Sequence, residues 1–416
     1  MGETTYVRKN TQTKPIKKPK LFLNIDLTMV VVVVLLLLLG LLMVYSSSWG
    51  FGIWSDNPKP THYMLGRQIR WVLLGSVLAI AVSYFDYHKI RKYLLPMMAT
   101  VVLLLLAVFI FGDERFNAQR TLFNGSIQPS ELAKLTIIIY LSFWLFSKKD
   151  QLNKILFGLV PLGMIIGIFA ILILFQPDLS AAITIVMLGG LLFFLADGEL
   201  RQIIIVALVA LIFILLAVTL FKTGQNRLIQ YLDGLKDPVN SSYHVKLSME
   251  AMINGGLFGV GIGKGTTKFL GLPVPWTDSI FAVIAEELGL IGAAVVICLF
   301  VLFLWRGIHI AQHAPDQLGK LLAGGITFWI IIEALINMGV LVNIFPFAGN
   351  ALPLVSAGGS NLVTTLAAVG ILLNVSRQST RHKKSEGRIP GASINMRRGD
   401  RRRRVSRSNR PSSRKE

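Results

Sequence analysis

Residues 27–45 read LTMVVVVVLLLLLGLLMVY and contain no charged side chain. An α-helix rises about 1.5 Å per residue, so roughly 20 apolar residues cross the hydrocarbon core of a bilayer. This run is therefore long enough to span a membrane. It is longer than the apolar core of a typical signal peptide, and further runs follow it, which predicts an uncleaved transmembrane helix.

Comparable apolar runs recur along the rest of the chain. With the first run they make ten, and the others lie near residues 70–86, 93–112, 131–147, 155–175, 180–196, 202–221, 280–305, 318–342 and 352–375. The pattern predicts an all-α polytopic membrane protein of about ten transmembrane helices. Residues 222–279 are expected to form a large extracytoplasmic loop before the eighth helix.

The composition excludes a water-soluble globular protein. Of the 416 residues, 53% are apolar and 15% are charged, whereas about a quarter of the residues in a soluble domain are charged. The single cysteine, Cys298, excludes an intrachain disulfide and a thiolate metal cluster. The histidines include no HExxH motif, and no dedicated metal site is expected.

The distribution of positive charge predicts the topology. The chain has 42 Lys and Arg residues against 22 Asp and Glu, and most of the basic residues lie in the two terminal segments and in the loops on the same side of the membrane. By the positive-inside rule, both termini are cytoplasmic. We expect a basic cytoplasmic segment at 1–26, a transmembrane domain at 27–375 and a disordered Arg-rich cytoplasmic tail at 376–416. The tail suits contact with anionic membrane lipid better than nucleic-acid binding.

Four polar clusters lie where helices are expected to end. The first is QPSELAK, residues 128–134, in which Pro129 and Ser130 suit the start of a helix. Glu131 and Lys134 are three residues apart and share one helix face. They are either functional groups or an internal ion pair that only satisfies two buried charges.

The second cluster is the glycine-rich run GGLFGVGIGKGTTK, residues 255–268, which follows an amphipathic stretch at 243–254. It imitates a phosphate-binding loop but fails the pattern. Phe258 stands where the first glycine belongs, and Lys264 is followed by Gly265 rather than Ser or Thr. No nucleotide site is expected.

The third cluster is PVPWTD, residues 273–278, directly before an expected helix that carries Glu286 and Glu287. Asp278 is either an N-terminal cap of that helix or a general base at the boundary between water and membrane. The two deeper glutamates indicate a polar cavity or strong packing partners.

The fourth cluster is FPFAGNALPLVSAGGS, residues 345–360. Its prolines and glycines predict a broken helix, which is tolerated at membrane depth where the backbone is buried in protein or lines a cavity.

Taken in order, these strings resemble the SEDS family, the polytopic peptidoglycan polymerases typified by FtsW and RodA, and resemble FtsW most. The resemblance runs from about Leu41 to Val375. QPSELAK is highly specific for the family. Four further strings are moderately specific, namely QPDL at 176–179, GGLFGVGIG at 255–263, FAVIAEELGLIG at 281–292 and the stretch from Asn337 to Ser360.

The resemblance implies a peptidoglycan glycosyltransferase that polymerises lipid II on the outer face of the bacterial cytoplasmic membrane. Asp278 matches the family's essential loop carboxylate and is the expected base. The residues expected to bind substrate are Arg120, Gln128, Ser130, Glu131, Lys134, Lys268, Ser356 and Ser360. The chain departs from the family pattern at Thr121, His244, Trp276, Ser279 and Ala357.

In the implied mechanism, Arg120, Lys134 and Lys268 hold the pyrophosphate of the donor, and Glu131 orients Lys134. No organic cofactor is expected. A divalent cation, Mg or Mn, could share the pyrophosphate role, although no ligand set for it is visible in the sequence.

The expected partners are lipid II, a class B penicillin-binding protein, other division proteins and membrane lipid, with no nucleic acid. The basic extensions favour septal synthesis during cell division. The alternatives are a RodA-like polymerase for elongation, a lipid II flippase and a non-catalytic scaffold of the same architecture.

Overall fold

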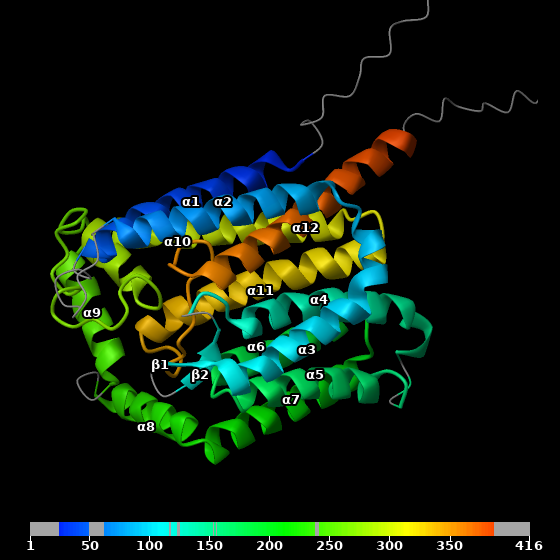
Figure 1. Ribbon diagram of the computed structural model, residues 1–416, viewed down its shortest axis with the longest axis horizontal. Helices are drawn as coiled ribbons and strands as arrows, with labels where there is room; N and C mark the ends of the chain where they lie inside the picture. The colour runs from blue at the N-terminus through cyan, green and yellow to red at the C-terminus, as the bar shows by residue number, and fades with distance from the viewer. Residues whose placement is uncertain are drawn as a thin grey trace, which may run out of the picture.

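The computed structural model describes residues 25–49, 62–115, 118–122, 125–152, 154, 156–237 and 241–386. Ten long apolar helices run roughly parallel or antiparallel to one another in a single bundle (Figure 1). They are α1 (Leu27–Ser47), α2 (Tyr63–Tyr84), α3 (Leu94–Phe111), α4 (Pro129–Ser147), α5 (Leu159–Leu174), α6 (Leu179–Leu195), α7 (Leu200–Leu220), α10 (Ile280–Gln312), α11 (Gln317–Leu341) and α12 (Gly359–Glu386). Each of the ten predicted apolar runs forms one of them.

Within the described residues, eight of these segments are long and apolar enough to cross a membrane, with α3 extended by the short helix η2 (Tyr87–Tyr93). The two others, α5 and α6, are equally apolar but have 16 and 17 residues. The prediction of an all-helical, polytopic membrane protein is therefore confirmed.

The remaining elements are short. Helices α8 (Lys222–Lys236) and α9 (Tyr243–Gly255) lie together at one end of the bundle, which we call the loop end (Figure 1). Strands β1 (Asp113–Arg115) and β2 (Ala118–Thr121) form an antiparallel hairpin at the same end, and the 3-10 turn η3 (Lys149–Gln151) lies at the other. This hairpin is the exception to an all-helical fold among the described residues.

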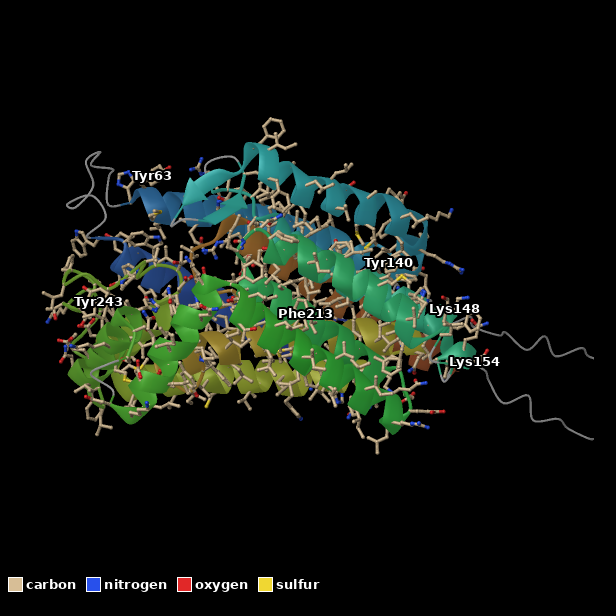
Figure 2. The ribbon with its side chains drawn as sticks, turned by 90° about the horizontal axis from the view of Figure 1, so that it is seen from below. Tyr63, Tyr140, Lys148, Lys154, Phe213 and Tyr243 are labelled. Atoms are coloured by element: carbon tan, nitrogen blue, oxygen red, sulfur yellow. The ribbon has the colours of Figure 1, made fainter. Side chains whose placement is uncertain are left out.

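The first residue of α1 and the last residue of α12 lie at the end opposite to the loop end, which we call the terminal end (Figure 1). Figure 2 shows Lys148 and Lys154 at the terminal end and Tyr63 and Tyr243 at the loop end. Lys148 and Lys154, which lie in one of the loops expected to be cytoplasmic, thus share an end with the start of α1 and the end of α12.

Four boundaries differ from prediction by about two helical turns or more, and one of them is the end of α10, at Gln312 rather than at 305. Helix α2 begins at Tyr63, earlier than expected, and the last helix begins at Gly359 rather than at 352. Pro353 has no amide hydrogen and Leu354 adopts a left-handed φ of 66°, so the chain cannot be helical there. Helix α12 continues to Glu386, so residues 376–386 belong to a helix rather than to the predicted tail. The rest of that tail, and residues 1–24, lie outside the described residues.

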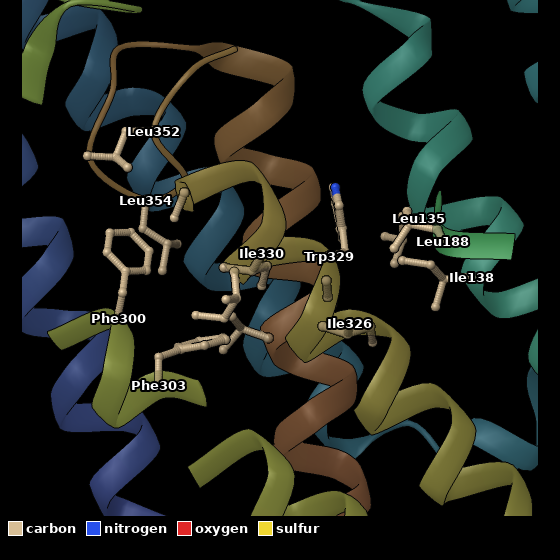
Figure 3. Packing of buried hydrophobic residues seen from close by; sticks show 14 of the residues in the cluster. Leu135, Ile138, Leu188, Phe300, Phe303, Ile326, Trp329, Ile330, Leu352 and Leu354 are labelled. Carbon is tan, nitrogen blue, oxygen red and sulfur yellow. The ribbon is translucent and has the colours of Figure 1, made fainter. Parts of the chain in front are cut away.

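The most buried helices form the centre of the bundle. In α4, α11 and α12, 72% of the membrane-spanning window is buried inside the protein, against 6% in α7. Figure 3 shows Trp329 of α11 facing Leu135 and Ile138 of α4, with Leu188 of α6 behind them. Trp329 is fully buried. The contact between α4 and α11 matters for the site because both helices carry charged residues one or two turns nearer the loop end.

Helix α10 is broken at Gly289, whose φ of 71° no other residue adopts easily. The break frees backbone groups that the glycine-rich run then satisfies. The amides of Val260 and Gly261 each donate to carbonyls of α10, those of Glu286 and Glu287, at 3.0 Å. A Cβ on Gly259 would lie 2.2 Å from the Glu287 carbonyl oxygen, so only glycine fits there. The glycines of this run therefore serve close backbone packing.

Candidate active site

A cavity of about 260 Å³ opens at the loop end of the bundle. Its walls come from β2, the starts of α4 and α6, the loop before α10, helix α11 and the segment before α12. Six charged residues line it, namely Arg120, Glu131, Lys134, Asp178, Asp278 and Glu333. Of the predicted site residues, Gln128 and Ser360 line it as well.

The loop that carries Asp278 is held by distant parts of the chain. Asn337 of α11 donates to the backbone carbonyl of Asp278 at 2.9 Å. Ser356 donates to the carbonyl of Thr277 at 2.6 Å, and the Ala357 amide donates to the carbonyl of Trp276 at 2.8 Å. Three consecutive carbonyls are thus fixed from outside. Ser356 does not line the cavity and acts on the site through this backbone.

Asp278 is not the N-terminal cap of α10. The cap position is Ser279, and it makes no side-chain capping bond. The Asp278 carboxylate instead faces the cavity, toward which it keeps some exposed surface. This placement excludes the capping interpretation, and the general base stays a prediction.

Burial raises the pKa of Asp278 to about 6, while the positive charges of Arg120 and Arg227 and a hydrogen bond from Thr277 act in the opposite direction. A carboxylate with this pKa is largely ionised at neutral pH and is still basic enough to accept a proton. It is therefore well suited to general-base catalysis.

Arg227 of α8 is a site residue that the sequence reasoning missed. Burial lowers its pKa, and so does the charge of Arg120, whereas Asp178 and Asp278 act in the opposite direction. Its guanidinium lies 5.3 Å from the centre of the Phe347 ring. Arg227 does not line the cavity, but the folding of α8 across the loop end brings its charge close enough to act on Asp178 and Asp278, and no local sequence signal marks it.

The predicted pair of Glu131 and Lys134 forms, and Glu333 of α11 joins it. The Lys134 ammonium lies 2.8 Å from Glu131 and also donates to Glu333. Asn361 donates to the second oxygen of Glu131 at 2.9 Å. The side chains of Glu131, Lys134 and Glu333 are 9%, 4% and 2% exposed. A lone glutamate inside an apolar span was the signal that could have found Glu333.

Gln128 and Ser130 are joined to Asp178, the aspartate of the QPDL string. Both side chains donate to one carboxylate oxygen of Asp178 at 3.1 Å. The other oxygen accepts from the Ala181 amide at 3.2 Å and caps α6. The hydroxyl of Ser360 accepts a hydrogen bond from the backbone amide of Gln128 at 2.9 Å. Asp178 is one of the four carboxylates that line the cavity, whereas Ser130, which is bonded to it, does not line the cavity.

Lys268 does not reach the cavity. Its ammonium makes a buried ion pair with Glu287 at 2.6 Å and also donates to the carbonyls of Ser46 at 3.0 Å and Gly263 at 3.3 Å. The Lys268 side chain is 1% exposed. Protein oxygens therefore surround this cation, and we assign it to holding the glycine-rich run between α1 and α10 rather than to the leaving group.

Glu286 and Glu287 also serve packing. Glu286 accepts from the amides of Thr266 and Thr267 at 2.9 and 3.0 Å, and Glu287 accepts from Ser46 and from the Gly263 amide. The sequence left open whether these two glutamates line a polar cavity or have strong packing partners, and the structure shows the packing partners.

In the described part of the chain, no cluster of three or more His, Cys, Asp or Glu side chains is arranged to hold a metal ion. Two cavity carboxylates, Glu131 and Glu333, already contact the ammonium of Lys134. The residues present therefore do not form a metal-ligand set of their own.

Comparison with known proteins gives concordant matches. A family model described as "Cell cycle protein", covering FtsW, RodA and SpoVE, matches residues 26–381. The chain is 37% identical over 358 residues to "Probable peptidoglycan glycosyltransferase FtsW" of Geobacter metallireducens, covering 84% of this chain and 94% of that protein. It is 36% identical over 360 residues to "Stage V sporulation protein E" of Bacillus subtilis, covering 85% and 97%.

Two solved structures share the fold. One, described under "Structural coordination of polymerization and crosslinking by a peptidoglycan synthase complex", has a TM-score of 0.69 at 25% identity and covers 86% of this chain and 99% of that chain. The other, the rod shape determining protein RodA of Thermus thermophilus, has a TM-score of 0.63 at 24% identity and covers 86% and 98%.

Proposed function

The chain belongs to the FtsW, RodA and SpoVE family, and on this premise we propose that it is a peptidoglycan glycosyltransferase that polymerises lipid II. The observation that carries the proposal is Asp278, an enclosed carboxylate with a pKa of about 6, in a cavity that it shares with cationic residues. A sugar transfer from a pyrophosphate needs this combination of a base and positive charge.

In the proposed reaction, the 4-hydroxyl of the acceptor GlcNAc attacks C1 of the donor MurNAc. The new bond joins that oxygen to C1, and the bond between C1 and the pyrophosphate oxygen breaks with inversion. Asp278 takes the hydroxyl proton, and undecaprenyl pyrophosphate leaves with the electron pair. The cavity must supply two parts, namely a base beside the attacking hydroxyl and a cationic region for the leaving group.

Arg120 and Arg227 are the groups that we assign to the pyrophosphate. Their charges are close enough to repel, since Arg120 lowers the pKa of Arg227. An anion bound between them would relieve that repulsion. The Lys134 ammonium is shared between Glu131 and Glu333. We therefore assign Lys134 to holding α4 and α11 together at the wall of the cavity. Gln128 and Ser360 line the wall of the cavity near Asp178.

We propose that both termini are cytoplasmic and that the cavity opens on the outer side of the bacterial cytoplasmic membrane. The support is the excess of Lys and Arg in the terminal segments of the sequence and in loops such as the one that carries Lys148 and Lys154, which lies at the end opposite to the cavity. We further propose a septal role with a class B penicillin-binding protein as partner. Relatives named FtsW and a similar chain from a peptidoglycan synthase complex support this assignment.

The test is formation of glycan chains from labelled lipid II by purified protein, with and without a transpeptidase-inactive class B penicillin-binding protein. Wild type should make polymer and Asp278→Asn should lose 10²–10⁴-fold in rate. Asp233→Asn, an exposed aspartate on α8, is the matched control and should keep full activity. Polymer from folded Asp278→Asn would exclude Asp278 as the base. No polymer from folded wild type in any condition would overturn the proposal and favour a flippase, tested next in lipid vesicles.

A further inference from the structure

Two of the positions that depart from the family pattern, His244 and Ser279, contact each other. His244 Nε2 of α9 lies 2.5 Å from the hydroxyl oxygen of Ser279, the residue after Asp278. That hydroxyl donates to the carbonyl of Pro273 at 2.6 Å. Ser279 is fully buried and His244 is 7% exposed. The bond to Pro273 closes the turn from 273 to 279 into a ring that contains Asp278, and the bond to His244 ties this ring to α9.

The hydrogen bonds identify the form of the imidazole. Ser279 has one hydroxyl hydrogen, and the Pro273 carbonyl takes it. His244 must therefore donate from Nε2, which leaves Nδ1 without a hydrogen in a neutral ring. Burial lowers the pKa of His244 to about 4, so the ring stays neutral throughout the range in which Asp278 ionises. Nδ1 is buried, and no partner for it lies among the described residues.

His244 also contacts Phe347, the aromatic ring against which Arg227 lies. Its ring meets that of Phe347 edge to face, with ring centres 4.6 Å apart. The guanidinium of Arg227 lies over the same Phe347 ring. Gly349, two residues after Phe347, packs closely against Asp278, since a Cβ at this position would lie 3.2 Å from a carboxylate oxygen of Asp278. One imidazole thus supports both the loop of Asp278 and the ring beneath Arg227, although it does not line the cavity.

We propose that His244 is a positioning residue for the transfer reaction, which fixes Asp278 through Ser279 and Arg227 through Phe347. This inference rests on the proposed function, in which Asp278 is the base. Removing His244 would loosen the turn and admit water to the carboxylate. The groups that face Asp278 would remain Arg120 from β2, Arg227 from α8 and Asp178 at the start of α6.

The test compares the two single variants and the double variant with wild type by kcat, KM and the dependence of rate on pH. His244→Ala should lower kcat about tenfold, the cost of one lost hydrogen bond at the site, with little change in KM for lipid II. The acid limb of its profile should move below the wild-type position near pH 6, because a more hydrated Asp278 regains its ordinary pKa. Ser279→Ala should behave alike, and the double variant should be no worse than either single variant.

Rescue distinguishes positioning from packing. The amide of His244→Gln can reach the place of Nε2 and donate to Ser279, so this variant should recover most of kcat. The shorter amide of His244→Asn cannot reach Ser279 and should not. Ser248→Ala, which removes a buried hydroxyl bonded only within α9, is the control and should match wild type. Equal kcat and equal pH profiles in His244→Ala, His244→Gln and wild type would overturn the proposal.

An infrared titration of the carboxyl band that Asp278→Asn abolishes gives a second readout that needs no turnover. The midpoint should lie near pH 6 in wild type and lower in His244→Ala. An unchanged midpoint would refute the positioning role even if the proposed function were correct. If wild type makes no polymer, the proposed function fails, and the shift of this band still decides whether His244 sets the position of Asp278.

Discussion

Ser356, in the irregular segment before α12, donates a 2.6 Å hydrogen bond to the backbone carbonyl of Thr277, the residue before Asp278. The two residues are far apart in the chain, and the bond ties the loop before α10 to the loop before α12. Backbone that is not helical at membrane depth has to be satisfied within the protein. The irregular segment meets that need by holding the site.

The acid limb of the pH–rate profile should lie near pH 6, because Asp278 must lose its proton to act as a base. Arg227→Gln removes a positive charge that lowers the pKa of Asp278, so its acid limb should move to higher pH and its KM for lipid II should rise. Lys222→Gln, an exposed cation on the same helix, is the control and should keep the wild-type profile. A profile for Arg227→Gln that coincides with wild type would exclude Arg227 from the site.

Asp278→Asn should make the protein more stable above pH 6. Because the folded pKa of Asp278 is raised above 3.8, the folded state binds its proton more tightly than the unfolded chain does. The resulting stabilisation is complete below pH 3.8 and is lost as the pH rises through about 6. At pH 7.5 the Asn variant should be stabilised by about 3 kcal/mol, seen as a higher apparent melting temperature in detergent. The gain should vanish near pH 4, and a gain that is equal at both pH values would contradict this cause.

Lys134→Met should destabilise the protein by about 3–5 kcal/mol, because it leaves the buried carboxylates of Glu131 and Glu333 without a cation. Lys320→Met breaks a partly exposed pair with Asp197 and should cost about 0–1 kcal/mol. Melting temperatures in detergent compare the two.

Adding Glu131→Gln and Glu333→Gln to Lys134→Met should restore folding, since no unpaired charge remains. Polymerisation separates the two interpretations of this cluster. If the triple variant folds and is fully active, the cluster of Glu131, Lys134 and Glu333 serves only as an internal ion pair. If the triple variant folds but is inactive, the charge of this cluster is needed for the reaction.

Lys268→Met should weaken the attachment of the glycine-rich run by leaving Glu287 buried and unpaired. Adding Glu287→Gln should restore the melting temperature and the KM for lipid II together, because Lys268 lies outside the cavity. Steady-state kinetics of the double variant provide the check. A KM that stays high in the restored protein would return Lys268 to the substrate site.

The local sequence was sufficient for the ten helices. Residues 27–45 can be recognised as a membrane span without any knowledge of their neighbours, because the bilayer requires only length, apolar side chains and satisfied backbone groups. The same holds for the broken segment at 345–360, whose prolines and glycines prevent a continuous helix. The QPSELAK string likewise placed Glu131 and Lys134 on one face, since a spacing of three residues is enough for contact within a helix.

The tertiary structure decided which further residues join the cavity and which expected residues lie outside it. Asp178 and Glu333 line it from the start of α6 and from α11, and Arg227 of α8 acts on Asp278 through its charge. Lys268, which looked equally suitable as a cation near Asp278, turns away to pair with Glu287. An ion pair forms only when its two charged groups come within about 4 Å of each other. Which groups do so depends on which helices pack together and on where α10 breaks at Gly289. Periodicity and motif spacing describe each helix by itself and contain no information on those contacts.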